Sequence, residues 1–347
     1  MNILHVIAGA EVGGAETFAQ DAIVALAGRG VRQQVIARPW PRAMARYAEA
    51  GVPASGLGFN HHDRLLLASR RIRREAEAFG ADLVHAWMSR AASFIPKHMP
   101  CPVLGWFGDL YDMKYFRNVD ACVGVTPDIA AYLRGQGVPP ERTFMINTFG
   151  TMPNAAPVDR ASLDTPADAL VVLVLSRMHS VKGIDTMLHA LARVPGPYLW
   201  LAGEGPARGE YERLAQSLGL MGRVRFLGWR NDRRALLEAC DIVALPSRYE
   251  PFGTVIVEAW AMHRPLLATL ADGARQYVTD GRTGITCPIE DIAALAAGLS
   301  RLATEPALRQ SLAESGYAAY EAGFTREIVT ERLIACYESC IALGRRP

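Results

Sequence analysis

The chain has 347 residues, too many for one ordinary hydrophobic core and enough for two domains of roughly 150 residues each. Half of the residues are hydrophobic and 21% are charged, which is typical of a folded globular protein and excludes a disordered chain. The 37 basic and 35 acidic residues leave a net charge of +2, so no overall positive field indicates binding to nucleic acid.

Nothing in the sequence indicates export or a membrane span. The six cysteines form no Cys-x-x-Cys pair and no metal-like spacing with histidine, as expected for reduced, buried thiols in a cytoplasmic protein. The apolar N-terminus lacks a basic segment and runs at once into glycines and Glu11, so it fits a first β-strand better than a signal peptide. No stretch is long and apolar enough to cross a bilayer.

The first half of the chain alternates short apolar runs with amphipathic segments. Residues 2–8 read as a buried strand, 9–16 as a glycine-rich loop and 17–27 as a helix. Further strands are predicted near residues 34–37, 83–86, 103–106 and 121–125. Continuous apolar strands separated by helices indicate an α/β domain whose parallel sheet is covered on both faces.

The second half repeats this architecture after a linker. Residues 151–168 are rich in Pro, Ala and Asp and have no apolar stripe. Strands are then predicted at 169–176, 197–203, 223–228, 241–247 and 265–269, with helices between them and three helices closing the chain. We therefore expect two Rossmann-like domains, residues 1–155 and 165–322, that face each other across a ligand-binding cleft.

The most specific segment contains two glutamates with seven residues between them. Glu250 lies in the loop after a predicted strand and Glu258 on the following helix. A loop carboxylate can accept hydrogen bonds from sugar hydroxyls, and one about two turns along can reach the ribose of a nucleotide. The backbone N–H groups of Phe252, Gly253 and Thr254 would lie at the helix N-terminus, where an anionic group is favoured. The alternative is that both glutamates are solvated acids at a helix start.

A second segment places Arg177 and Lys182 between the strongest strand of the second half and the next helix. Open α/β sheets bind ligands at this carboxyl end of their strands. Two cations there can neutralise a leaving diphosphate, and such charge stabilisation is often the largest catalytic contribution. The alternative is a pair of surface cations.

Together, these motifs resemble the retaining glycosyltransferases of family 4, which have the GT-B fold. No single glycine-rich motif is specific, but five occur here in the order of that family and cover nearly the whole chain. They are Gly13-Gly-Ala-Glu16, Ser176 to Gly183, Gly203-Glu-Gly-Pro206, Phe226-Leu-Gly228, and Glu250 with Glu258.

The resemblance assigns a role to each matching residue. It implies that Arg177 and Lys182 bind the diphosphate, Glu250 holds the transferred sugar and Glu258 holds the ribose. Glycines without a Cβ would allow close approach to the donor phosphate or the acceptor. The remaining implied binding residues are Gly13 and Gly14 in the first domain, Gly203 and Glu204 near the nucleotide, and Leu227, Gly228 and Trp229 around the base. For Gly203 and Glu204, a plain strand-to-helix turn is the alternative.

The family also implies how the domains are used. The first would bind the acceptor, the second would bind the nucleotide-sugar, and residues 323–347 would form a helix that returns to the first domain. The expected function is retaining, metal-independent transfer to a glycan or lipid-linked acceptor. The diphosphate would leave and the acceptor would attack on the same face of the sugar. A UDP-sugar is favoured as donor, with GDP- and ADP-sugars open, and no permanently bound cofactor is expected.

Two departures from the family pattern stand out. Many relatives carry a histidine after a first-domain strand, where this chain reads Val103 to Asp109 without one; Asp109 or backbone groups are candidates to replace it. Relatives usually have Gly-Gly and then Glu where this chain has Asp272 to Tyr277, with Gln276 near the acid position. Tyr111 to Asp120 is similar to a bacterial subgroup linked to surface polysaccharide or lipopolysaccharide core assembly.

The histidines and one basic segment allow weaker predictions. His85 is predicted at a strand end, as an acceptor contact or a core histidine, and His179 is predicted to shape the loop before Lys182. His61 and His62 have no third metal ligand in view. Residues 64–74 form a predicted helix that carries Arg70, Arg71, Arg73 and Arg74, either a solvated face or a docking surface for the anionic inner face of the cytoplasmic membrane.

Two other functions remain open at this point. A nucleotide-sugar epimerase would act on the donor without an acceptor. A catalytically inactive sugar-nucleotide-binding subunit would bind the donor without turnover, which fits the missing histidine. A dinucleotide dehydrogenase is a poor fit, because no Gly-x-Gly-x-x-Gly follows either leading strand with an acid about twenty residues on.

Overall fold

The protein consists of two compact units. The computed structural model describes residues 1–11, 13–59, 67–150, 152 and 154–346. One unit comprises Met1–Phe149 together with Arg326–Pro347, and the other comprises Gly150–Thr325. The first unit is therefore built from both ends of the chain, and the second from one continuous segment.

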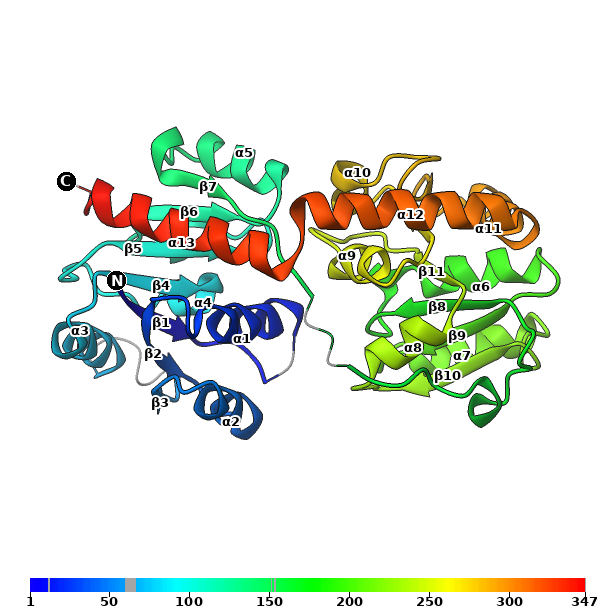
Figure 1. Ribbon diagram of the computed structural model, residues 1–347, viewed down its shortest axis with the longest axis horizontal. Coiled ribbons are helices and arrows are strands. Elements are labelled where there is room, and N and C mark those ends of the chain that lie inside the picture. The colour runs from blue at the N-terminus through cyan, green and yellow to red at the C-terminus, as the bar shows by residue number, and fades with distance from the viewer. Residues whose placement is uncertain (12, 60–66, 151, 153, 347) are drawn as a thin grey trace. The chain divides into compact units, whose positions relative to one another are not determined.

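The first unit contains a seven-stranded sheet in the order β3-β2-β1-β4-β5-β6-β7, and every strand pair is parallel (Figure 1). The strands are β1 (Asn2–Ile7), β2 (Arg32–Ala37), β3 (Ala54–Gly56), β4 (Leu83–Trp87), β5 (Val103–Phe107), β6 (Ala121–Gly124) and β7 (Thr143–Met145). Every residue of β4, β5 and β6 is buried. Because side chains alternate between the two faces of a sheet, both faces of these strands must be covered.

Helices supply that cover. They are α1 (Gly14–Leu26), α2 (Pro41–Glu49), α3 (Leu67–Phe79), α4 (Met88–Ala92), α5 (Pro127–Gly135) and α13 (Arg326–Leu343). The last of these comes from the far end of the chain and packs against α1 and β4 (Figure 1). Its Tyr337 hydroxyl lies 2.8 Å from His85 Nδ1 in β4, and Arg142 Nη1 donates to the Gly344 carbonyl at 2.9 Å just beyond it.

The second unit contains a six-stranded parallel sheet in the order β10-β9-β8-β11-β12-β13. The strands are β8 (Val171–Leu175), β9 (Tyr198–Ala202), β10 (Val224–Gly228), β11 (Ile242–Leu245), β12 (Leu266–Thr269) and β13 (Ile285–Cys287). The helices are α6 (Ile184–Ala192), α7 (Arg208–Ser217), α8 (Arg233–Ala239), α9 (Thr254–Ala261), α10 (Asp272–Tyr277), α11 (Ile292–Thr304) and α12 (Pro306–Gly323).

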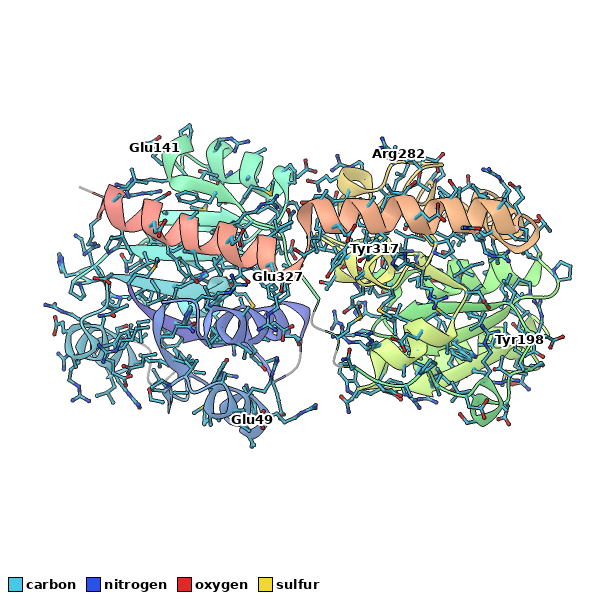
Figure 2. The ribbon with its side chains drawn as sticks, viewed as in Figure 1. Glu49, Glu141, Tyr198, Arg282, Tyr317 and Glu327 are labelled. Atoms are coloured by element: carbon cyan, nitrogen blue, oxygen red, sulfur yellow. The ribbon has the colours of Figure 1, made fainter. Side chains whose placement is uncertain are left out.

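Aromatic contacts attach the long helix α12 to this unit. The ring of Tyr317, labelled in Figure 2, stacks on His263 in the turn after α9, with ring centroids 3.7 Å apart. Trp260 of α9 is fully buried and donates from Nε1 to the Thr283 carbonyl at 2.8 Å. A Cβ on Gly316 of α12 would lie 2.4 Å from the Trp260 ring, so glycine allows the two helices to approach closely.

The predicted alternation of strands and helices in both halves is confirmed. The segment Asp272–Tyr277, predicted only as a departure from a motif, forms the six-residue helix α10, and the three-residue strands β3, β7 and β13 were not predicted. Elements this short carry too few residues for a periodic pattern. Among the described residues, no helix is both long and apolar enough to span a bilayer.

Candidate functional site

The second sheet reverses its strand order between β8 and β11, which are adjacent in the sheet but far apart in the chain. Ligands of open α/β sheets bind outside the carboxyl ends of the strands at such a switch point. Lys182 lies in the loop that follows β8, and Glu250 lies in the loop that follows β11. The topology thus brings these two predicted residues to the same place.

Lys182 and Glu250 form an ion pair there. Lys182 Nζ lies 2.7 Å from Glu250 Oε2, and each side chain is 16% exposed. Ser247 Oγ also donates to Glu250 Oε2, at 3.3 Å. An ammonium group has three donor hydrogens, so Lys182 can keep this contact and still donate to a second acceptor. The pair therefore leaves an oriented cation near the surface at the switch point.

The loops that carry this pair are bonded to each other through Arg248. Its backbone N–H donates to the Val181 carbonyl at 2.8 Å, and its guanidinium makes two hydrogen bonds to Asp185, at 2.8 and 2.7 Å. Burial would raise the pKa of the Asp185 carboxyl, but the hydrogen bonds and charge of Arg248 lower it overall. Glu290 accepts a further bond from Arg248 at 2.6 Å. Sequence analysis gave Arg248 no role, although it lies two residues before Glu250.

Glycines bring the neighbouring loops into backbone contact. Gly203 has φ 154°, and its N–H donates to the Gly228 carbonyl at 2.8 Å. A Cβ at Gly203 would lie 1.9 Å from the Ser176 carbonyl oxygen, a distance that no side chain tolerates. Met178 N–H donates to the Glu204 carbonyl at 2.9 Å. The loops after β8, β9 and β10 thus meet at one edge of the sheet.

The side chains on these loops are more exposed than the Lys182–Glu250 pair. Arg177 is exposed beside the Lys182 loop, and Glu204 forms an ion pair with Arg208. Trp229 is 53% exposed and donates from Nε1 to Asn231 Oδ1 at 3.1 Å. Leu227 is half-buried. These four groups lie at the carboxyl edge of the second sheet, as the motifs require.

Helix α9 starts at Thr254, and its N-cap Gly253 has φ 82° and no capping side chain. The first N–H groups of a helix generally lack a partner within the helix, although here the Ile256 N–H donates to the Gly253 carbonyl at 2.8 Å. The side chain of Phe252, just before this helix, is buried, and its ring centroid lies 5.4 Å from that of Tyr277. The segment therefore combines a buried anchor with an uncapped helix start.

Glu258 is buried rather than surface-exposed. Its side chain has no exposed area and pairs with Arg233 Nη1, on α8, at 2.6 Å. The solvated-acid alternative is therefore wrong for Glu258. A Cβ on Gly150 would lie 2.9 Å from Glu258 Cγ, so the linker backbone also approaches this side chain. Sequence analysis missed Arg233, because its contact with Glu258 depends on how α8 and α9 pack.

In the first unit, the glycine-rich loop closes on a glutamate of its own. Glu16 Oε1 accepts the Ala10 N–H at 3.1 Å. A Cβ would lie 2.2 Å from a Glu16 carboxylate oxygen if placed on Gly13, and 2.4 Å if placed on Gly9. Gly14, at the start of α1, has open space around the same position. A Cβ at position 13 would therefore require the Glu16 carboxylate to move, whereas Gly14 faces free space.

The histidine predictions have mixed outcomes. His85 is not at a strand end but inside β4, with no exposed area, so its position is that of a core histidine. His179 caps the short 3-10 helix Ser180–Lys182 by accepting the Val181 N–H at 3.4 Å. His61 and His62 lie outside the described residues. Within the described part of the chain, no three His, Cys, Asp or Glu side chains are grouped as a metal site would need.

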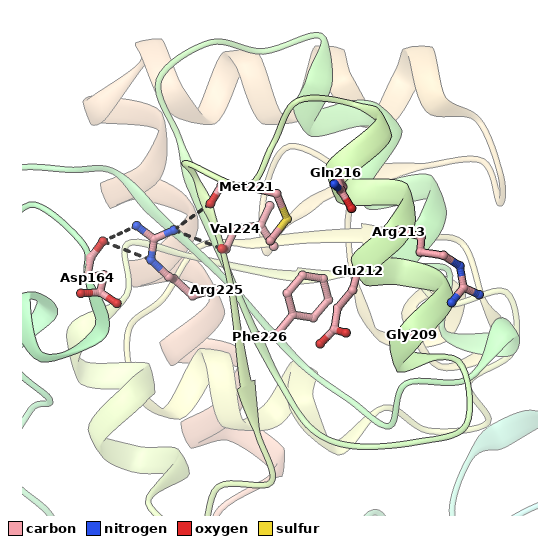
Figure 3. A pocket seen from close by; sticks show the side chains of 9 residues that line it. All are labelled: Asp164, Gly209, Glu212, Arg213, Gln216, Met221, Val224, Arg225 and Phe226. Carbon is pink, nitrogen blue, oxygen red and sulfur yellow. Dashed lines mark hydrogen bonds between the residues drawn. The ribbon is translucent and has the colours of Figure 1, made fainter.

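A cavity of about 740 Å³ lies elsewhere in the second unit, between α7 and the edge strand β10 (Figure 3). Phe226, Glu212 and Arg225 are among its lining residues, and Arg225 Nε donates to the Asp164 carbonyl at 3.1 Å. None of the predicted donor residues is among its described lining residues. The cavity is therefore separate from the switch-point site.

Comparison with known proteins places the chain in a family. The pattern of "Glycosyl transferases group 1" matches residues 156–319, and that of "Glycosyltransferase Family 4" matches residues 12–149. Over 334 residues the chain is 37% identical to the lipopolysaccharide core biosynthesis glycosyltransferase LpsE of Rhizobium meliloti, covering 95% of this chain and 97% of LpsE. The chain belongs to glycosyltransferase family 4. It is therefore an enzyme that transfers a sugar from a nucleotide-sugar donor.

Other relatives of this family 4 glycosyltransferase agree. LpsD of the same Rhizobium meliloti strain, also a lipopolysaccharide core biosynthesis glycosyltransferase, is 33% identical over 344 residues, which is 99% of each chain. The crystal structure of HepE from Anabaena with UDP and glucose has a TM-score of 0.83 at 23% identity, covering 98% of this chain and 100% of HepE. A glycosyltransferase structure from Rickettsia africae has a TM-score of 0.87 at 18% identity, covering 98% of both chains. The predicted GT-B fold class is confirmed.

Proposed function

We propose that this enzyme is a retaining, metal-independent glycosyltransferase that uses a UDP-sugar to extend the lipopolysaccharide core on the cytoplasmic side of the membrane. The observation that carries the donor assignment is the Lys182–Glu250 ion pair at the switch point of the second sheet. The core acceptor is suggested by LpsE and LpsD, and UDP by the bound nucleotide of HepE. The first unit would bind the acceptor and the second the donor.

The donor diphosphate fits the cations at this edge. Lys182 would donate to a phosphate oxygen while its contact with Glu250 fixes its direction. Arg177, exposed on the same loop, would provide a second charge, and the uncapped start of α9 would provide backbone N–H donors. Together these groups would stabilise the negative charge that develops on the leaving diphosphate. Without them, another positively charged group would have to stabilise it.

The chemistry proposed for these groups breaks the anomeric C–O bond to the diphosphate and forms one to an acceptor hydroxyl on the same face of the sugar. The proton of that hydroxyl passes to a diphosphate oxygen. Glu250 would bind a hydroxyl of the transferred sugar through the carboxylate oxygen that does not contact Lys182. The family resemblance assigns Glu258 to the ribose end of the same site, and its ion pair with Arg233 would fix the direction of the carboxylate.

Peripheral membrane contact would involve only part of the basic helix. Residues 64–66 of the predicted basic helix lie outside the described residues, and α3 starts at Leu67, which is 70% exposed. Arg71 and Arg73 pair with glutamates four residues on, at 2.7 and 2.8 Å, which reduces the net charge of this face. Arg70 and Arg74 remain exposed for an anionic lipid surface.

The donor assignment can be tested with nucleotides alone. A ligand that binds only the folded state raises the melting temperature, so UDP is expected to stabilise the enzyme more than GDP or ADP. The increase should shrink in Lys182→Ala and Arg177→Ala and persist in Arg193→Ala, an exposed arginine of the same unit. Equal increases in all three variants would reject the donor site.

The reaction can be tested with a UDP-sugar and a lipopolysaccharide core acceptor. We expect an α-linked product from an α-configured donor, detected by NMR, and full turnover after treatment with EDTA. Lys182→Ala and Arg177→Ala should each lower kcat at least 100-fold, because a donor to the developing charge typically contributes that much. An inverted product, or loss of turnover with EDTA, would contradict the proposed mechanism.

A further inference from the structure

Two arginines stand at the carboxyl edge of the first sheet, and neither has an acidic partner among the residues that the structure describes. Arg38 directly follows β2, and Arg90 lies in α4, which directly follows β4 and packs against β1. Strand β1 lies between β2 and β4 in the sheet. The two arginines therefore flank the end of β1, where the chain enters the glycine-rich loop.

The backbone holds Arg38 against that loop. Its N–H donates to the carbonyl of Ile7, the last residue of β1, at 3.2 Å. Two residues further on, Trp40 Nε1 donates to the Gly9 carbonyl at 3.3 Å. This position is the switch point of the first sheet, because the strand order reverses between β1 and β4. A ligand of the first unit is expected at this edge.

Arg38 is poorly satisfied by the chain itself. Its Nε is inaccessible to solvent and has no hydrogen-bond partner in the described part of the chain, and its Nη2 makes one long bond, 3.5 Å, to the Phe59 carbonyl. Desolvation, followed by the positive charge of Arg90, lowers the pKa of the Arg38 guanidinium. A charged donor held beside a like charge is costly unless an anion joins them.

The neighbouring arginines behave differently. Arg46 on α2 pairs with Asp21 at 2.6 Å, and Arg71 on α3 pairs with Glu75 at 2.7 Å. Neither Arg38 nor Arg90 has an ion pair among the described residues, although both stand at the edge where a ligand would enter. Arg46 and Arg71 thus have carboxylate partners within the fold, whereas Arg38 and Arg90 are available to another anion.

We propose that Arg38 and Arg90 bind an anionic group of the acceptor, either a phosphate or a sugar-acid carboxylate, over the end of β1. The planar guanidinium forms paired, charge-assisted hydrogen bonds with both groups. The site selects acceptors that carry a negative charge near the hydroxyl to be glycosylated. This inference rests on the proposed function, since it assumes that the first unit binds the acceptor.

The first test measures transfer to a core oligosaccharide acceptor. Arg38→Gln and Arg90→Gln should each raise the acceptor KM about tenfold or more, with the donor KM within about twofold of wild type. The control is Arg42→Gln, which removes an exposed arginine of α2 and should leave both constants unchanged. Phosphatase treatment or carboxyl reduction of the acceptor shows which group is bound, because the effective treatment raises the wild-type KM and abolishes the effect of the variants.

The second test does not depend on turnover. Phosphate can also bind the donor site, so it is added to Arg177→Ala/Lys182→Ala, which lacks the donor-site cations. We expect inorganic phosphate to raise the melting temperature of this variant, and the rise to disappear when Arg38→Gln and Arg90→Gln are added. No rise with phosphate, or an acceptor KM that is the same in both glutamine variants as in Arg42→Gln, overturns the inference. Absence of transfer by the wild type would instead contradict the proposed function.

Discussion

Acid should destabilise the first unit through His5, a histidine buried inside β1. Its Nδ1 accepts the Trp87 Nε1 hydrogen at 3.2 Å, so the neutral ring carries its hydrogen on Nε2 and donates it to Gln33 Oε1 at 3.0 Å. Protonation would place a hydrogen on Nδ1, directly opposite the Trp87 donor. Burial therefore lowers the pKa of His5 from 6.5 to about 3, although the bond to Gln33 acts in the opposite direction.

The direction of the effect follows from proton uptake. The unfolded chain binds a proton at His5 below about pH 6.5, while the folded unit does not bind it until about pH 3. Stability is thus fully present above pH 6.5 and is lost as the pH falls towards 3. For His5 alone, linkage gives a loss of about 2 kcal/mol between pH 7 and pH 5. Burial, and then the charge of His5, also lowers the pKa of His85, which acts in the same direction.

Hydrogen exchange measured by mass spectrometry can assign this loss to the first unit. Peptides covering Asn2–Ile7 and Leu83–Trp87 should lose protection on going from pH 7 to pH 5, after correction for the intrinsic exchange rate. Peptides covering Val171–Leu175 in the second unit are the internal reference and should change much less. This comparison is needed because a protein of two units does not unfold in a single two-state step.

Variants separate His5 from other titrating groups. His5→Gln removes one titrating proton, so the protection of the β1 peptide should depend less on pH, even if its value at pH 7 is lower. His98→Gln, which changes an exposed histidine of the same unit, should retain the wild-type pH dependence. If His5→Gln and wild type lost equal free energy between pH 7 and pH 5, the assignment to His5 would be wrong.

Three further predictions concern packing. Arg233→Met should lower the free energy of unfolding in urea by about 2 kcal/mol, because the buried Glu258 loses its charged partner. The double variant Arg233→Met/Glu258→Met should recover part of that loss. Strictly additive effects of the two substitutions would argue against the ion pair. Gly203→Ala should lower the free energy of unfolding by several kcal/mol or prevent folding, since its Cβ would overlap the Ser176 carbonyl oxygen. The control Gly209→Ala, whose Cβ would lie at an ordinary 3.5 Å from Arg213 Nη1, should raise the melting temperature slightly. Tyr337→Phe should cost about 1 kcal/mol and increase hydrogen exchange in α13, and unchanged exchange would show that its hydroxyl contributes nothing.

The longer strands of both units could be predicted because a buried parallel strand is a continuous apolar run that needs no information from elsewhere in the chain, whereas the three-residue strands β3, β7 and β13 are too short for such a run. The positions of Lys182 and Glu250 at strand ends followed in the same way. Their ion pair did not, because it requires β8 and β11 to be adjacent in the sheet. Strand order is set by long-range packing, which local sequence patterns do not contain.

Buried polar residues were the least predictable part. His5 and His85 occupy positions where an apolar residue would satisfy the strand pattern, and their partners Gln33, Trp87 and Tyr337 come from distant segments. A sequence pattern shows a polar residue in a strand but not what satisfies it. The loops that carry the predicted donor residues meet at one edge of the second sheet, as the motifs suggested. The role of each residue in binding the donor is still a prediction.

The discontinuity of the first unit has a consequence for biosynthesis. Its sheet is complete by Met145, yet the helix that carries Tyr337 against His85 is translated almost two hundred residues later. The second unit has its entire sequence available before that helix emerges from the ribosome, so it can finish folding first. A nascent or C-terminally truncated chain would therefore hold a finished second unit beside a first unit whose β4 surface is still uncovered. Such a chain should depend on chaperones until the last turn of α13 is made.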